Sequence, residues 1–242
     1  MNKMINTTKD AGLHCPAIRA AMKEFFLMKK AFYKTSSLIT HELDLKKQEI
    51  IIGLLLGDLF AEGVANVQKD PKSNTRLQFK GSAQNAPYIN HLYEIFKDFC
   101  NSTPKISMSK ENRPNRKSEF YFVKFWTASL PIFNKFRKDF YDEKGKKRLP
   151  LNLEALITAR SLAYWAMDDG YKTKKGFYFC TESFTFAENE TLKLILKNKF
   201  SLNAGVHKHT NGYRLYIHST SINLFKEMIR PYVIKHFSYK LY

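Results

Sequence analysis

The spacing of apolar side chains predicts a helix over residues 47–60, with Ile50, Leu54 and Phe60 among its buried positions. Apolar and polar residues alternate over 75–82, which is the pattern of a strand with one buried face. The elements expected in the first half are a helix at 47–60, a strand at 75–82, a helix at 86–99, strands at about 104–110 and 118–127 joined by a polar loop at 111–117, and a helix at about 129–140.

The second half repeats this order. Its expected elements are a helix at 159–169, a strand at 176–183, a helix at 187–200, a hairpin of 206–209 and 213–219 with Asn211-Gly212 at its turn, and a helix at about 221–230. A solenoid needs three or more units, so two copies indicate a duplicated domain. We predict an α+β fold of two pseudo-symmetric repeats. Its parts are a basic N-terminal extension (1–45), a first repeat (46–140), a linker (141–158) and a second repeat (159–242).

The net charge of +18 over 242 residues favours a polyanionic partner, either nucleic acid or an anionic membrane surface. No apolar run approaches the roughly 20 residues that span a bilayer, so we expect no membrane partner. Cys15, Cys100 and Cys180 are far apart and form no CxxC pair. They predict buried free thiols rather than a zinc site or a disulfide framework.

Two predicted helices end in the same way. Gly53 and Gly57 share one face of the first helix, and small residues at this spacing allow two helix backbones to approach closely. Packing of the two helices side by side would bring Asp58 and Asp169 together. The two segments are Ile51-Ile52-Gly53-Leu54-Leu55-Leu56-Gly57-Asp58 and Leu162-Ala163-Tyr164-Trp165-Ala166-Met167-Asp168-Asp169-Gly170.

One carboxylate at a helix end has an ordinary explanation, since the helix simply meets water there. Two adjacent carboxylates repel each other and need cations. The repeat of Asp58 and Asp169 therefore predicts a metal site, and Mg²⁺, which prefers oxygen ligands and phosphate, suits it. We include Gly57 and Asp168 in this metal site as neighbouring positions. Asp168 points about 100° away from Asp169 around the helix and is expected to be structural.

The two segments resemble the paired motifs of the LAGLIDADG homing endonucleases, in the single-chain form with two motifs. The resemblance covers roughly residues 46–242. The second copy matches at its opening Leu-Ala and closing Asp-Gly, whereas the first departs at Ile51-Ile52 and at Leu59. Tyr164 also replaces a small residue, so uneven helix packing is expected there.

The resemblance implies an αββαββα fold in each half, with the motif helices at the centre and both antiparallel sheets forming a saddle over double-stranded DNA. It implies a monomeric, Mg²⁺-dependent endonuclease of intron homing, in which Mn²⁺ or Ca²⁺ could replace Mg²⁺ in binding. Such an enzyme would cut both strands of a long asymmetric site and leave a short 3′ overhang. Asp58, Asp169, Lys147 and Lys240 would be its catalytic residues; solvated lysines in basic segments are the alternative for the last two.

The polar sides of the strands are the predicted DNA-facing surface, although a merely solvated face would show the same pattern. Gln78 and Glu182 are expected on the first strand after each motif helix, within reach of the active centre through water. Alternate histidines on a hairpin are more often surface residues than metal ligands. The full set of candidates is Arg76, Gln78, Lys80, Lys105, Ser107, Ser109, Lys124, Glu182, His207, His209, Arg214, Tyr216 and His218.

Two other functions stay open. The same fold can act as an intron RNA maturase that binds RNA without cleaving it. A basic RNA-binding or ribosome-associated protein is the third possibility, but paired acidic helix ends beside a polyanion would serve it poorly. Richness in Lys, Asn, Ile and Phe fits an AT-rich genome, and organelle introns are the family's usual setting, so we expect a mitochondrial or chloroplast location.

Overall fold

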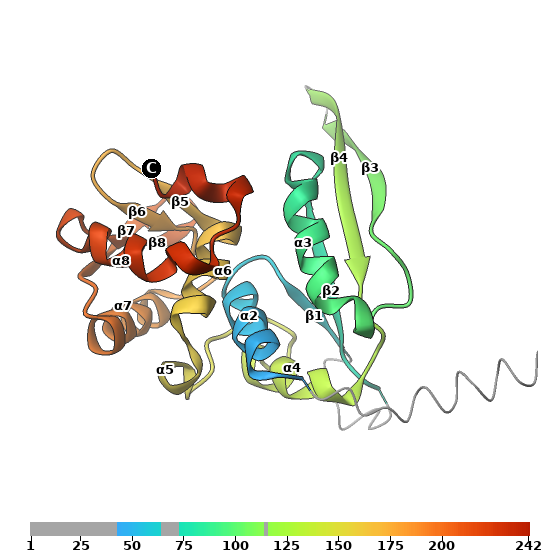
Figure 1. The fold of residues 1–242 in the computed structure, drawn as a ribbon, viewed down its shortest axis with the longest axis horizontal. Coiled ribbons are helices and arrows are strands. Elements are labelled where there is room, and N and C mark those ends of the chain that lie inside the picture. The colour runs from blue at the N-terminus through green and yellow to red at the C-terminus, as the bar shows by residue number, and fades with distance from the viewer. Residues whose placement is uncertain (1–42, 64–72, 114–115) are drawn as a thin grey trace, which may run out of the picture. The chain divides into compact units, whose positions relative to one another are not determined.

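The two motif helices, α2 (Leu45–Leu56) and α6 (Ala159–Asp169), pack against each other at the centre of the described chain (Figure 1). The computed structural model describes residues 43–63, 73–113 and 116–242, without the side chains of 110–118. The part from Leu43 to Tyr242 forms one unit. Cys15 and all of the predicted basic extension before residue 43 lie outside the described residues.

The elements repeat in the predicted order. In the first half, α2 is followed by β1 (Phe60–Glu62), β2 (Arg76–Ser82), α3 (Ala86–Phe96), β3 (Lys105–Arg113), β4 (Arg116–Trp126) and α4 (Asn134–Phe140). In the second half, a short α5 (Leu153–Leu156) precedes α6, β5 (Gly170–Lys172), β6 (Phe177–Phe179), α7 (Phe186–Phe200), β7 (Ala204–His209), β8 (Gly212–Ile217) and α8 (Ile222–Ile229). The predicted α+β fold of two repeats is confirmed.

Each half contains one antiparallel sheet of four strands. Their orders are β1-β2-β4-β3 and β5-β6-β8-β7, so the two sheets have the same topology. Helix α3 covers β2 and β4, and α7 covers β7 and β8. Leu77 and Phe79 are buried on the helix side of the first sheet, as Phe177 and Phe179 are on that of the second.

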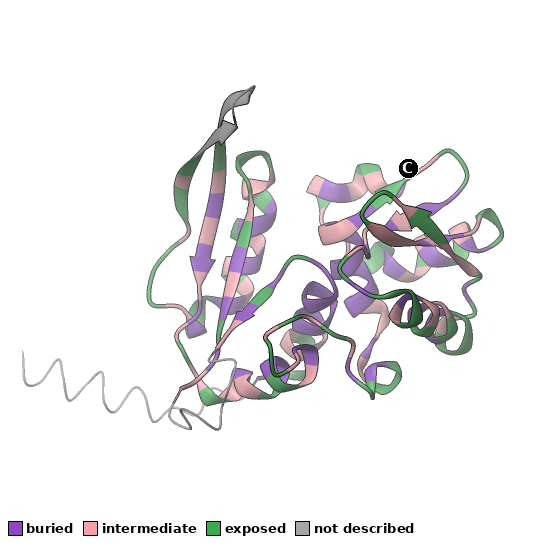
Figure 2. Ribbon diagram, turned by 180° about the vertical axis from the view of Figure 1, so that it is seen from behind, coloured by how far each residue is buried: buried purple, intermediate pink, exposed green. Residues whose placement is uncertain are grey.

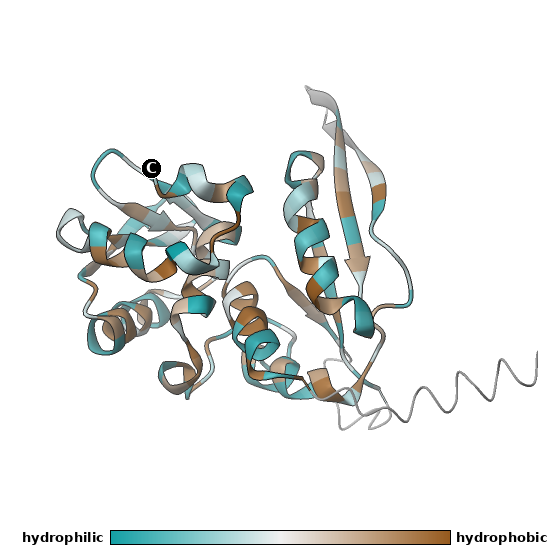
Figure 3. Ribbon diagram, viewed as in Figure 1, coloured by the Kyte–Doolittle hydropathy of each residue, from teal (hydrophilic) through white to brown (hydrophobic). Residues whose placement is uncertain are grey.

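The capping residues explain where these helices begin. The Asp44 side chain accepts a hydrogen bond from Lys47 N at the start of α2. Thr158 and Ser161 form a reciprocal capping box at the start of α6. From Ile50 to Leu56 every residue of α2 is buried (Figure 2), and Figure 3 shows this helix mostly in the colour of apolar residues. A helical segment that is apolar all round belongs inside a core, and the second half of α2 lies there.

The backbones of α2 and α6 approach closely at Gly53. A Cβ atom placed on Gly53 would lie 2.2 Å from the carbonyl oxygen of Ser161. Only glycine fits this crossing. Tyr164, where a small residue was expected, is buried and bonds through its hydroxyl to His91 Nε2 of α3 at 2.9 Å. The Tyr164 side chain therefore contacts α3, and the uneven packing of the two motif helices at this position stays a prediction.

Several boundary predictions were wrong. Helix α2 ends at Leu56, and Phe60 lies in β1 with 41 % of its surface exposed. The loop expected at 111–117 is largely strand, because β3 and β4 stay paired to Arg113↔Arg116. The strand expected at 176–183 stops at Phe179, and the linker holds α5. The helix expected at 129–140 begins as a 3₁₀ turn (Pro131–Phe133) before α4.

Among the described residues, no helix is both long enough and apolar enough to span a membrane. Cys100 and Cys180 are free thiols, as predicted, but both are half-buried rather than buried.

Replacing Gly53 by alanine should destabilise the protein. Alanine would gain about 1 kcal/mol of helix propensity, but the overlap with the Ser161 carbonyl group forces a backbone shift. We expect a net loss of about 1–3 kcal/mol, measured from the midpoint of urea unfolding. Gly205→Ala is the control, because its Cβ would meet only the ring atoms of His218 and His207, at 3.1 and 3.3 Å. Equal stability of the two variants would contradict the close crossing.

Candidate active site at the paired helix ends

Asp58 and Asp169 lie at the adjacent ends of α2 and α6, as the motif predicted. Asp58 follows the cap residue Gly57 and is exposed, whereas Asp169 is the last residue of α6 and is half-buried. The helix α2 stops two residues before its acidic residue, and α6 runs through to its own. The two copies of the motif therefore present equivalent carboxylates from different backbone conformations.

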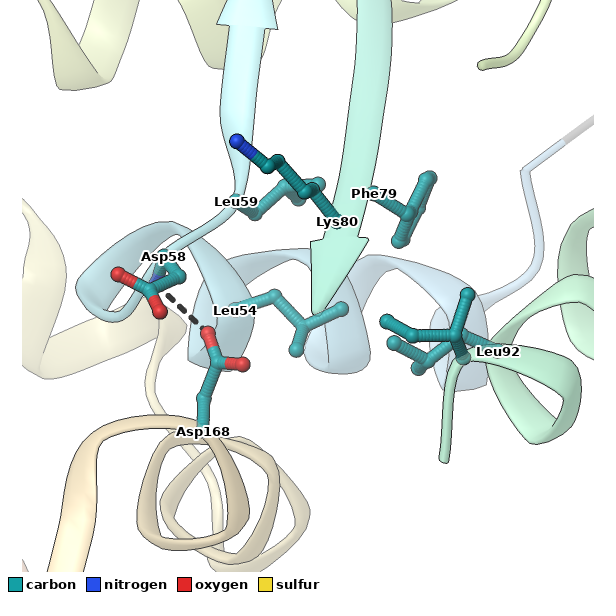
Figure 4. Close-up of a pocket in the computed structure, with 8 residues that line it drawn as sticks. Leu54, Asp58, Leu59, Phe79, Lys80, Leu92 and Asp168 are labelled. Carbon is teal, nitrogen blue, oxygen red and sulfur yellow. Dashed lines mark hydrogen bonds between the residues drawn. The ribbon is translucent and has the colours of Figure 1, made fainter. Parts of the chain in front are cut away.

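Asp168 links the two helix ends. Its Oδ2 accepts a hydrogen bond from the backbone N–H of Asp58 at 2.6 Å (Figure 4). A Cβ atom on Gly57 would lie 2.4 Å from this oxygen, so the small residue is required there. Asp168 and Gly57 thus have a packing role, and one carboxylate oxygen of Asp168 is already occupied.

Each half contributes one lysine that binds the end of its own motif helix. Lys147 Nζ donates to the carbonyl oxygens of Gly57 and Leu59 at 2.5 and 3.2 Å. Lys240 Nζ donates to those of Ala166 and Met167 at 3.0 and 2.6 Å. Free carbonyl groups give a helix C-terminus a partial negative charge, and an ammonium group neutralises it. The lysines that the resemblance singled out therefore lie beside the carboxylates.

The carboxylates and lysines perturb one another. Burial raises the pKa of Asp169 to about 8, with Asp168 and Asp58 adding repulsion. Burial and the Asp58 charge raise the pKa of Asp168 to about 7. Burial also lowers the pKa of Lys240 to about 8 and that of Lys147, although the aspartates oppose both shifts. Such perturbed groups gathered in one place are typical of functional sites.

The donor set fits a hard divalent cation. Within the described ranges there is no cluster of three or more His, Cys, Asp or Glu that would hold a metal ion unaided. Magnesium commonly binds through one or two carboxylates and completes its shell with water and substrate phosphate. Asp58 and Asp169 would hold it, because they are the acidic residues at the two adjacent helix ends.

Tyr88 of α3 is a residue of this region that the motifs did not identify. It is 3 % exposed, and its hydroxyl has no hydrogen-bond partner within the described structure. Burial raises its pKa well above the usual value, and the charges of Asp168, Asp169 and Asp58 add to this. A buried hydroxyl without a partner is costly, so Tyr88 adds a polar group to the surroundings of the acidic cluster. In the sequence, Tyr88 looks like an ordinary apolar position of a helix.

The polar face of the first sheet carries a row of three lysines. Lys124 of β4 lies directly opposite Lys80 of β2 and Lys105 of β3. Lys80 and Lys124 lie 4.3 and 5.2 Å from the ring centre of Phe122. Like charges in opposite positions destabilise a sheet, and in the described chain no carboxylate pairs with these lysines. Such a surface is suited to phosphate groups.

The other predicted residues of the first sheet share this face. Gln78 lies opposite Trp126, and Ser107 and Ser109 lie opposite Phe122 and Phe120. Arg76 is exposed and forms an ion pair with Glu62 at 2.6 Å. Its guanidinium group is therefore partly neutralised before any ligand binds.

The polar face of the second sheet carries a cluster of aromatic and histidine rings. The rings of Tyr178, Tyr216 and His207 lie in mutual contact, with centroids 4.6 Å apart for Tyr178–Tyr216 and 5.1 Å for His207–Tyr216. Tyr178 shares a hydrogen bond with His207 Nδ1 at 2.7 Å. His218 contacts Tyr216 edge-on at 5.3 Å. Three of the predicted residues, His207, Tyr216 and His218, thus form one connected cluster with Tyr178, whereas His209 lies beside Glu182.

Glu182 is not where the sequence placed it. It lies in a turn beyond the end of β6, where it is bonded to Arg214 Nε, and its Oε1 is 3.5 Å from His209 Nδ1. The strand ends early because the Thr181 hydroxyl, and not a strand carbonyl, accepts from Leu215 N. Glu182 is therefore occupied by ion pairs on the sheet.

A duplicated α+β fold with a paired carboxylate centre and basic strand faces defines a class of nucleic-acid-binding proteins. A profile of the LAGLIDADG DNA endonuclease family matches residues 48–225. The chain belongs to this family.

Named relatives of the chain include both endonucleases and maturases. It is 30 % identical over 221 residues to the cytochrome b mRNA maturase bI2 of Debaryomyces hansenii, covering 88 % of this chain and 81 % of the relative. It is 31 % identical over 205 residues to the probable intron-encoded endonuclease 1 of Wickerhamomyces canadensis, covering 81 % and 83 %. The solved structure of the homing endonuclease I-WcaI bound to its DNA recognition sequence is similar, with a TM-score of 0.75, 29 % identity, and coverage of 87 % and 92 %.

The acidic cluster should make metal-free stability depend on pH. Between about pH 4 and 8 the folded protein keeps a proton on Asp169 that the unfolded chain has lost. The free energy of unfolding therefore falls as pH rises through this range. The Asp169→Asn variant has no titratable group at this position. Its melting temperature should therefore match that of the wild type near pH 5 and exceed it at pH 8.5. About 1 kcal/mol corresponds to about 2–4 °C in a domain of this size.

Thermal melts in EDTA measure this difference. Asp98→Asn removes an exposed carboxylate of the 3₁₀ turn Lys97–Phe99 and is the control for charge alone. A gap between Asp169→Asn and wild type that stays constant from pH 5 to 8.5 would contradict the raised pKa.

Proposed function

We propose that this protein is a site-specific, divalent-metal-dependent endonuclease that cuts both strands of a long asymmetric DNA site and leaves a short 3′ overhang. The observation that carries the proposal is the pair of carboxylates at adjacent helix ends, each accompanied by a lysine of its own half. A centre with two equivalent halves suits a substrate with two equivalent backbones. The similarity to DNA-cleaving relatives supports the same function.

The residues of the site have separate roles in this reaction. Asp58 and Asp169 hold the metal, which can activate water, shield the scissile phosphate and stabilise the leaving oxygen. Lys147 and Lys240 fix the helix ends and place positive charge beside the attacked phosphate. Asp168 keeps the two helix ends in register through its bond to Asp58 N.

The row of Lys80, Lys124 and Lys105 supports binding to a phosphate backbone. Contacts of this kind position a protein on the duplex without reading sequence. Discrimination among bases would come from Gln78, Arg76 and the histidine–tyrosine cluster of the second sheet, whose side chains can hydrogen-bond to base edges.

A maturase function is the second candidate, because a cytochrome b mRNA maturase is among the relatives at comparable identity and coverage. Intron RNA would then be bound without cleavage. For either function we place the protein in an organelle, where intron-encoded relatives of this kind are found. We also propose that the protein acts as a monomer, since one chain supplies both carboxylates.

The first test is cleavage of a plasmid that carries the uninterrupted host gene, with and without Mg²⁺. Wild type should linearise it at a single position only when the cation is present. Asp58→Asn and Asp169→Asn should each lose linearisation or leave nicked circles, with a rate loss on the order of 100-fold or more, because each removes an oxygen ligand. Gel electrophoresis of the three plasmid forms measures the result.

Asp98→Asn should cut like the wild type. Unchanged cleavage by Asp58→Asn or Asp169→Asn would refute the assigned centre. If folded wild type cuts no correct target but binds the intron RNA tightly in EDTA, the maturase function replaces the nuclease.

A further inference from the structure

The strand registers allow the two halves to be matched residue by residue. The residue two positions after each acidic residue is paired with the next strand in both halves: Phe60 lies opposite Gln78, and Tyr171 lies opposite Tyr178. Gln78 and Tyr178 therefore hold equivalent positions. The buried residues agree, because Leu77 and Phe79 correspond to Phe177 and Phe179.

Two residues further along the chain, in β2 and just beyond the end of β6, the matched positions differ in charge. The first half has Lys80 and the second has Cys180. Each directly follows a buried phenylalanine. A thiol cannot carry a positive charge, so only the first half has a cation at this position.

Lys80 lies beside the acidic residue of its own half. Lys80 and Asp58 line the same pocket together with Leu54, Leu59 and Asp168 (Figure 4). They also line a neighbouring open pocket with Gln78 and Ser82. No described carboxylate forms an ion pair with the Lys80 ammonium group, which lies over the Phe122 ring.

The second half offers no replacement at the same place. The backbone N–H of Cys180 donates to the carbonyl oxygen of Asp169 at 2.9 Å, so this position adjoins the acidic residue directly. Arg214 is the cation nearest in the sheet register, but it is held by Glu182 and donates to the Tyr171 hydroxyl at 2.9 Å. The hydroxyl of Tyr178 is likewise bonded to His207.

We propose that Lys80 is a catalytic residue of the first half alone, contacting the phosphate cut beside Asp58, and that the two strands are consequently cut at unequal rates. The inference rests on the proposed nuclease function. The half that contains Cys180 cuts its strand more slowly, because the scissile phosphate there faces one lysine, Lys240, instead of two.

Strand-resolved cleavage tests the proposal. A target duplex carries a different fluorophore on each strand and is cut by excess protein in Mg²⁺. Wild type should accumulate a duplex nicked in one strand. Lys80→Met should slow that first cut by about tenfold or more and leave the other strand within about twofold. The affected strand should be the one impaired more by Asp58→Asn than by Asp169→Asn.

Lys105→Met is the matched control, because it removes a lysine from the same row at a position outside the Asp58 pocket. Binding of both lysine variants to the duplex in EDTA should weaken to a similar extent. The ratio of the two strand rates should change in Lys80→Met alone. Equal slowing of both strands by Lys80→Met would make Lys80 a simple backbone contact and would overturn the proposal.

Cys180→Lys tests the other half. It should speed the slower cut, whereas Cys180→Ser, which stays small and neutral, should leave both rates unchanged. A folded Cys180→Lys variant with no faster second cut would overturn the proposal, since a missing cation would not be what limits that half. If the wild type cuts neither strand, the nuclease function itself fails, and that result is distinct from equal cutting of both strands.

Discussion

The contact between α2 and α6 is the constraint on which the centre of this protein depends. Burial of two apolar helices against each other, with Gly53 against the Ser161 carbonyl group, is favourable. The same contact brings two helix C-termini and three carboxylates into one place, which is electrostatically unfavourable. Apolar packing therefore holds together a site that charge alone would push apart. Lys147 and Lys240 offset part of the repulsion by binding the exposed carbonyl groups.

The repulsion that these two lysines do not offset favours the binding of a cation at this site. Burial and the mutual repulsion of the aspartates raise the pKa values of Asp168 and Asp169, so protons neutralise part of the cluster when no metal is bound. A divalent cation can take the place of those protons. The fold thus keeps a region that is less stable than it could be, as is common where function requires a strained or charged arrangement. Tyr88, with its buried and unpaired hydroxyl, belongs to the same region and adds to this cost.

The sequence was sufficient for the features that depend on local pattern. The bounds of α6 were predicted as 159–169 and confirmed, because a capping box at Thr158 starts the helix and Gly170 follows its end. Helix α2 was predicted too long, since apolar residues continue past Gly57 and helical spacing does not distinguish them from strand β1. The sequence did not predict the full length of the β3–β4 hairpin, because the residues at its tip are polar and show no alternation of apolar and polar positions.

The sequence predicted those residues of the candidate site that belong to the motifs or follow from the family resemblance. Asp58 and Asp169 were found from a repeated motif and the two lysines from the family resemblance, and the structure brings each lysine to its helix end. The bond from Asp58 N to Asp168 depends on rotation about two helices, which spacing alone does not fix. Glu182 was predicted to be the counterpart of Gln78, whereas the strand registers make Tyr178 the equivalent of Gln78. Register is a long-range property, and no single stretch of sequence contains it.

The row of Lys80, Lys124 and Lys105 leaves uncompensated positive charge on the polar face of the first sheet. Lys124 faces a like charge on each side, and such pairs weaken strand association unless an anion lies over them. The second sheet has aromatic rings and histidines on the corresponding face and carries no such repulsion. Phosphate contacts release counterions and are sensitive to salt, whereas ring and hydrogen-bond contacts to bases are much less so. The polar faces of the two sheets in one duplicated fold therefore differ in their charge pattern, because the first carries three lysines that no described carboxylate neutralises, whereas Arg214 of the second is paired with Glu182.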